Sequence, residues 1–131
     1  MDAYYSKVRE YLLDLNISII RELPDENMMV VDQEEAGIRN MVLVITDPIL
    51  IMEQAIFEVK EPSVRLFESL LKKNRDIVHG AFALDDSGKK VIFRDTLQLE
   101  NLDLNELDGS FKSLELLLNE YSEQLLEFPK S

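Results

Sequence analysis

The chain has 131 residues, of which 46% are hydrophobic, and this is enough for one domain with a sizeable core. Its formal net charge of -12 argues against nucleic acid as a partner, because such binding depends on Lys and Arg replacing phosphate counterions. The absence of Cys excludes disulfides and thiolate zinc sites and favours a reducing compartment.

No targeting or membrane segment is evident in the sequence. Residues 1–7 lack the basic and then apolar run of a signal peptide, so we expect no export by that route. The longest apolar stretch, residues 41–52, is interrupted at residues 46–48 and is shorter than the roughly 20 residues of a membrane span. We therefore expect no membrane partner and a single cytoplasmic domain over residues 1–131.

The charges are unevenly distributed. Residues 60–94 carry eight basic and five acidic side chains, whereas the rest of the chain holds 6 of the 14 basic and 21 of the 26 acidic residues. The simpler interpretation is a solvated surface that like charge keeps soluble. The alternative is that the acidic part orients a basic partner.

The N-terminal residues predict an amphipathic helix that ends near Asn16, a residue that tolerates the left-handed conformation. Its apolar positions recur at helical spacing: Tyr4, Val8, Tyr11, Leu12 and Leu15. Residues 17–23 and 28–32 are rich in strand formers and flank the turn formers of residues 24–27, which predicts a first hairpin.

Residues 38–46 and 49–60 follow, joined at Asp47-Pro48. Their nearly continuous apolar character predicts strands that are covered on both faces or lie in the centre of a sheet. The methionines in these runs and in residues 28–32 fill a core in the simpler interpretation and form an adaptable partner surface in the other.

A second helix is predicted from Pro62, which a first helical turn tolerates, to Asn74. Its apolar stripe consists of Val64, Phe67, Leu70 and Leu71. Residues 77–84 and 90–94 then form a hairpin around residues 85–88, where Gly88 can take a positive φ. Alternation in the first of these strands places Val78, Gly80, Phe82 and Leu84 on one face and His79, Ala81 and Ala83 on the other.

Asp103, followed three residues later by Glu106, is a variant of the capping box and predicts the start of a helix about 35 Å long. Its apolar seam consists of Leu104, Leu107, Phe111, Leu114, Leu118, Tyr121, Leu125 and Phe128. Three further residues fall off this seam: Leu116, Leu117 and Leu126. They are candidate partner-binding residues, and the alternative is that they extend burial over a broad sheet.

Catalytic and cofactor motifs are not found in the sequence. His79 is the single His, and a chain with one His and no Cys offers few side chains for a metal site or a catalytic dyad. Residues 80–90 resemble a phosphate loop only superficially, because Lys90 replaces the required Ser or Thr. Residues 104–115 match the later part of a calcium loop, but Leu104 occupies the first ligand position. We expect no enzyme, no cofactor and no metal.

The order of elements and several short motifs together resemble the YbjN-like family, which shares the fold of type III secretion chaperones. The motifs are Leu70-Leu71 and Asn74 at the end of the middle helix, Gly80 and residues 82–85 in the hairpin, residues 91–94, and Leu97, Leu99, Leu102 and Asp103 before the last helix. The resemblance covers nearly the whole chain. It implies an α+β domain of order α-β-β-β-α-β-β-α, with an antiparallel sheet packed by helices.

The same resemblance implies a homodimer that binds extended protein segments without nucleotide or metal. We therefore expect a non-enzymatic protein-binding module, chaperone-like or regulatory. A second hypothesis is a regulatory domain that senses a small apolar ligand between the sheet and the long helix, which rests on the abundance of Leu, Ile and Met there.

Overall fold

The computed structural model describes residues 3–125, with side-chain surroundings described through residue 120. The helices are α1 (Ala3–Asp14), α2 (Val64–Asn74) and α3 (Leu104–Leu125), with two short 3-10 turns, η1 (Pro24–Glu26) and η2 (Glu34–Ala36). The strands are β1 (Ser18–Leu23), β2 (Met28–Gln33), β3 (Ile38–Thr46), β4 (Ile49–Glu58), β5 (Ala81–Leu84) and β6 (Lys90–Gln98). The α+β class is confirmed.

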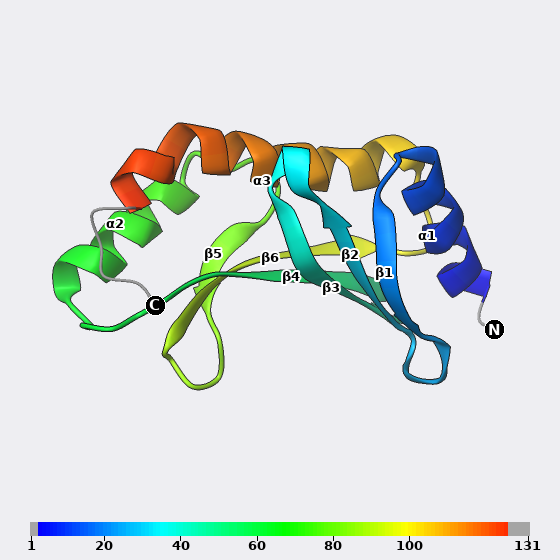
Figure 1. Cartoon of the computed structure of the whole chain (residues 1–131), viewed down its shortest axis with the longest axis horizontal. Coiled ribbons are helices and arrows are strands. Elements are labelled where there is room, and N and C mark those ends of the chain that lie inside the picture. Colours follow the sequence, from blue (N-terminus) through cyan, green and yellow to red (C-terminus); the bar gives the residue numbers. More distant parts are fainter. Residues whose placement is uncertain (1–2, 126–131) are drawn as a thin grey trace.

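The strands form one antiparallel sheet in the order β1-β2-β3-β4-β6-β5. Four strands lie between α1 and α2, one more than in the order α-β-β-β-α-β-β-α, because residues 18–33 and 38–58 each make a complete hairpin. The central position predicted for β3 and β4 is confirmed. Figure 1 shows α3 running along the sheet, with α1 near one end and α2 near the other.

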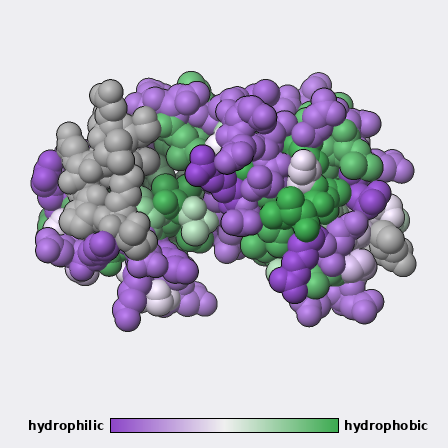
Figure 2. All heavy atoms as spheres, in the orientation of Figure 1, coloured by the Kyte–Doolittle hydropathy of each residue, from purple (hydrophilic) through white to green (hydrophobic). Residues whose placement is uncertain are grey.

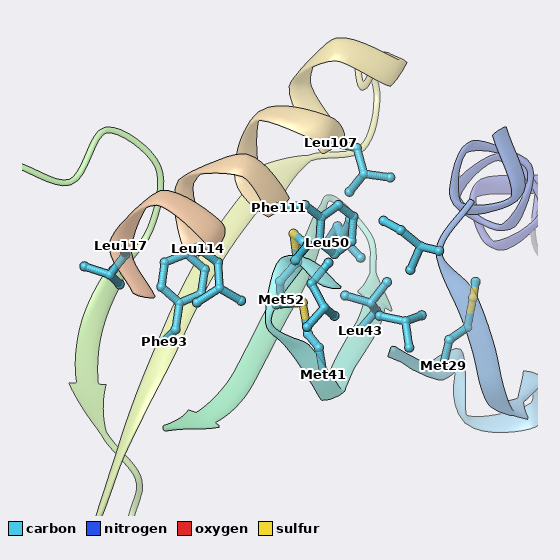
Figure 3. Packing of buried hydrophobic residues seen from close by; sticks show 14 of the residues in the cluster. Met29, Met41, Leu43, Leu50, Met52, Phe93, Leu107, Phe111, Leu114 and Leu117 are labelled. Carbon is cyan, nitrogen blue, oxygen red and sulfur yellow. The ribbon is translucent and has the colours of Figure 1, made fainter. Parts of the chain in front are cut away.

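The core lies between the helices and one face of the sheet. Every second side chain is buried from Met41 to Ile45 in β3 and from Leu50 to Gln54 in β4. Those labelled in Figure 3 lie on the side of the sheet that α3 covers. The strand residues that fill this layer include Met29, Met41, Leu43, Leu50, Met52 and Phe93. Removing one such side chain from water contributes roughly 1.5–3 kcal/mol, so the layer holds the helices on the sheet.

The ends of the helices follow from a few polar residues. Asn16 has a φ of 60° just after α1, as predicted. The Ser63 hydroxyl accepts a hydrogen bond from the Leu66 amide at 3.1 Å and caps α2, so Pro62 lies before the cap and not in the first turn. The Asp103 carboxylate accepts from the Glu106 amide at 2.8 Å, which is the predicted cap of α3.

The predicted start of the second hairpin is wrong. Strand β5 begins at Ala81, and residues 77–80 are not in a strand. Gly80 has a φ of +83°, outside the extended region, so strand alternation does not apply before this residue. Val78 is accordingly 84% exposed instead of sharing the buried face of Phe82.

The predicted stripe of α2 is also partly wrong. The buried residues of this helix are Leu66, Leu70 and Lys73, whereas Val64 and Leu71 are 80% and 68% exposed. Val64 and Leu71 are seven residues apart and lie on one side of the helix, turned away from the core. A count of apolar positions could not separate these two faces, because both carry large apolar residues.

Candidate partner-binding surfaces

The three predicted partner-binding leucines have different positions. Leu116 is 62% exposed on α3, whereas Leu117 is only 2% exposed and belongs to the core. Leu117 follows Leu114 by three residues and continues the buried face of α3, so it is unavailable to a partner and the burial alternative applies to it. Leu126 lies outside the described residues.

Leu116 borders a groove of about 160 Å³ between α3 and the loop before β5, and the exposed Val78 lines the same groove. The Ser113 hydroxyl donates a hydrogen bond to the backbone carbonyl of His79 at 2.8 Å and ties the loop to the helix. The imidazole of His79 lies close to Gly109, where a Cβ atom would come within 3.3 Å of Nε2. His79 thus packs on α3.

A second groove, of about 280 Å³, lies between α2 and the edge strand β5. It is lined by Phe67, Leu70, Leu71, Phe82, Ala83 and Leu84. Leu71 and Leu84 are 68% and 44% exposed, and Val64 extends the apolar surface along α2. We call this region the α2–β5 surface. Its exposed side chains are large and apolar, whereas a surface that only faces solvent needs no such group of residues.

A third surface lies on the side of the sheet opposite the core. The described helices cover β2, β3 and β4 on one face only. Of the two alternatives predicted for residues 38–46 and 49–60, the central position therefore applies and burial on both faces does not. The alternate side chains form the open sheet face, which consists of Leu23, Met28, Val30, Val42, Val44, Ile49 and Ile51. All are partly exposed, and none packs against the core.

The strand register makes the open sheet face continuous. Leu23 is paired with Met28, Met28 with Val44, and Val44 with Ile51, and in the next row Val30 is paired with Val42. Figure 2 shows hydrophobic atoms, in green, below α3 in the region where Figure 1 draws β1, β2 and β3. This second row ends in charged residues on both sides, since Arg21 is paired with Val30 and Glu53 with Val42. Glu53 in turn forms an ion pair with Arg94 at 2.7 Å.

A hydrogen bond and an ion pair that share the Glu22 carboxylate connect two elements of the fold. The Tyr5 hydroxyl donates to the Glu22 carboxylate at 2.9 Å, and Arg9 pairs with the same oxygen at 3.1 Å, which joins α1 to β1. Burial of the phenol, together with this hydrogen bond, raises the pKa of Tyr5 to about 12. Within residues 3–120, no group of three or more His, Asp or Glu side chains is placed to hold a metal ion.

These surfaces belong to a fold that occurs in known proteins. The CesT_Tir_1 family model matches residues 1–131. The chain belongs to this family of type III secretion chaperones. A comparison with curated protein sequences finds no match.

Solved structures with a similar fold include YbjN from E. coli, with a TM-score of 0.69, 12% identity and 92% of each chain covered. The HopA1–SchA chaperone–effector complex has a TM-score of 0.67 and 10% identity, with 92% of this chain and 94% of that chain covered. The Yersinia pestis type III secretion chaperone SycH, solved with a fragment of YscM2, has a TM-score of 0.62 and 17% identity, with 92% and 98% covered. These similarities confirm the fold expected from the YbjN-like resemblance.

None of the described helices of this CesT_Tir_1 member is both long enough and apolar enough to cross a membrane. The sequence identified Leu116 as a surface residue but missed the open sheet face. A signal for it was present in residues 41–45 and 49–52, where both alternate sets of strand positions are apolar, although a sheet covered by helices on one face buries only one set.

Proposed function

We propose that the chain is a non-enzymatic, homodimeric protein-binding module of the cytoplasm, chaperone-like or regulatory in role. The observation that carries this proposal is the number of large apolar side chains that the described residues leave partly or largely exposed on the α2–β5 surface and the open sheet face. Contiguous apolar surface of this kind marks sites of protein association. Membership in a chaperone family supports the same conclusion.

The α2–β5 surface is the proposed contact between two copies. Two chains of net charge -12 repel each other, and only residues 60–94, which include α2 and β5, carry more basic than acidic side chains. Two copies therefore meet with least repulsion through this end of the molecule. The exposed Val64, Leu71 and Leu84 supply the apolar area for the contact.

Light scattering and affinity capture test this function. We expect a dimer for the native chain and a monomer for Leu71→Glu, because a carboxylate would be buried in the contact. Val78→Glu is the matched control, since Val78 is 84% exposed outside the α2–β5 surface, and it should stay dimeric. A monomeric native chain that captures no stoichiometric partner from cells of the source organism would contradict the proposal.

The second hypothesis, a small apolar ligand between the sheet and α3, gains no support. The layer between them is filled by side chains that are fully or almost fully buried, including Met52, Phe93 and Phe111 (Figure 3). Close packing of this kind leaves no room for a ligand.

A further inference from the structure

We infer that Asn74 closes the β5 edge of the sheet to strand pairing, so that a second copy meets the α2–β5 surface through side chains only. This inference rests on the proposed function, the homodimer, and specifies how its two copies make contact. It starts from the position of β5, which is the last strand of the sheet and has β6 on one side only. A strand in this position presents backbone groups that can pair with another chain.

Of the four residues of β5, two turn their backbone amide and carbonyl groups away from β6. Just after the strand, the Asp85 amide bonds to the Lys90 carbonyl of β6 at 3.0 Å. Bonded pairs alternate along an antiparallel ladder, so the odd-numbered residues of β5 point toward β6. Phe82 and Leu84 therefore point toward the free edge.

The free edge cannot be extended at either end of β5. Gly80 would be the next residue in the series, but its φ of +83° takes the chain out of the extended conformation. At the other end the chain turns back, because the Gly88 amide bonds to the Asp85 carbonyl at 2.9 Å. Strand pairing at this edge is therefore confined to Phe82 and Leu84.

Asn74, the last residue of α2, occupies one of these two positions. Its Nδ2 donates to the Phe82 carbonyl at 3.1 Å, and its Oδ1 accepts from the Phe82 amide at 2.8 Å. Both backbone groups that a neighbouring strand would use at Phe82 are thus already bonded. Leu84 alone is left for pairing with another chain.

Pairing of two β5 strands around a two-fold axis would need the groups that Asn74 occupies. In an antiparallel pair, two opposite residues exchange both of their hydrogen bonds. If Phe82 lies opposite Leu84 or Phe82 of the other copy, the amide and the carbonyl of Phe82 are both required. If Leu84 lies opposite Leu84, a single bonded pair remains, which contributes little beside the burial of apolar side chains.

Apolar side chains next to this edge supply the contact instead. Val64, Leu71 and Leu84 are 80%, 68% and 44% exposed. Leu71 and Leu84 also line the groove of about 280 Å³ between α2 and β5. Burial of such side chains depends on area and not on the direction of backbone groups, so two copies can pack there while their β5 edges stay unpaired.

Amide hydrogen exchange of the full-length chain, followed by NMR, tests the closure itself. The Phe82 amide should exchange at least about tenfold faster in Asn74→Ala than in the native chain, because it loses its acceptor. Asn74→Asp keeps an acceptor for this amide and should change the rate by less than about threefold. The Asp85 amide, bonded to Lys90, is the internal control. Equal rates for Phe82 in the native chain and in Asn74→Ala would overturn the inference.

The mode of contact is tested in dimers that combine a ¹⁵N-labelled chain with a ¹³C-labelled chain. We expect interchain NOEs between methyl groups of Val64, Leu71 and Leu84 and none between backbone protons of the two β5 strands. An interchain NOE between these backbone protons in the native dimer would reject the inference. This measurement needs no substitution, so it decides the question even if Asn74→Ala does not fold.

The same experiment on Asn74→Ala tests whether Asn74 is the residue that keeps the edge closed. Without the amide, Phe82 and Leu84 are both free to pair, so backbone NOEs between the β5 strands of two copies should appear. Their absence from a folded Asn74→Ala dimer would show that something other than Asn74 keeps the edges apart.

The outcomes separate this inference from the proposed function. A native dimer with paired β5 strands would leave the homodimer standing and reject the closed edge. A native monomer whose Phe82 amide loses its protection in Asn74→Ala would reject the homodimer and leave the closed edge standing.

Discussion

The side-chain amide of Asn74 makes two hydrogen bonds to the backbone of Phe82. Its Nδ2 donates to the Phe82 carbonyl at 3.1 Å, and its Oδ1 accepts from the Phe82 amide at 2.8 Å. The side chain thus takes the place of a neighbouring strand at the edge of β5. The two backbone groups are partly buried, so they need this partner.

Replacement of Asn74 by Ala should lower the free energy of unfolding by about 1–3 kcal/mol, because it leaves a backbone donor and acceptor unpaired. Chemical denaturation measures this loss. Asn101→Ala, at an exposed position, is the control and should change stability by less than about 0.5 kcal/mol. Equal effects of the two substitutions would mean that water replaces the amide of Asn74.

Ionisation of the Tyr5 hydroxyl makes the free energy of unfolding depend on pH in the alkaline range. Its pKa in the folded state is about 12, above the ordinary value of 10.0, so ionisation favours the unfolded chain. The contribution of Tyr5 is fully present below pH 10.0 and is lost as the pH rises toward 12. We expect Tyr5→Phe to lose less stability than the native chain between pH 10.0 and about pH 12 in urea denaturation. A parallel loss in both proteins would contradict this assignment.

At the scale of elements, the β5–β6 hairpin keeps Phe82 buried, as predicted, although the start of its first strand was predicted wrongly. Phe82 is 6% exposed, as its predicted place on the buried face requires. Phe82→Ala should therefore cost about 3–5 kcal/mol in free energy of unfolding, whereas Lys89→Ala in the exposed turn should be nearly neutral. Equal small losses in denaturation would mean that the hairpin packs by its other face.

The loop that leads into β5 depends on Gly80 in two ways. Its φ is +83°, and a Cβ atom there would come within 2.5 Å of Phe93 Cζ and 3.0 Å of the Arg94 carbonyl oxygen. Gly88 has a similar φ of +71° but no atom within 4 Å of a Cβ. Substitutions at the two positions therefore distinguish the cost of a positive φ from the cost of a steric clash.

Gly88→Ala should cost about 1 kcal/mol in stability, the usual penalty of a positive φ. Gly80→Ala should cost about 2 kcal/mol more, because the added methyl group also displaces Phe93. Thermal unfolding of the two variants measures the difference. Equal costs would show that Phe93 moves freely enough to accept the methyl group.

At the scale of the whole molecule, the layers are asymmetric. Three helices and one face of the sheet enclose a single core, while the other face carries the partly exposed side chains of the open sheet face. Residues 60–94, the part of the chain with more basic than acidic side chains, include α2 and β5 at one end of the molecule. The layers thus leave large apolar side chains exposed in two separate places, the α2–β5 surface and the open sheet face.

The sequence by itself determined the helices and the two hairpins, because periodicity, caps and turn residues act over a few neighbouring positions. The α+β class was expected from the family resemblance. Asn16, Asp103 and Gly88 are local signals of this kind, and each is where it was predicted. The sequence also indicated the family, through an order of elements and motifs that spans the chain.

Only the tertiary structure decided which apolar residues are covered. Leu116 and Leu117 are neighbours of the same type, yet one is 62% exposed and the other 2% exposed, because they lie on different sides of α3 relative to the sheet. Val44 lies in an apolar run as strong as that of a buried strand and is nevertheless on the uncovered face. Burial depends on what other elements pack against a residue, and that information lies far away in the chain.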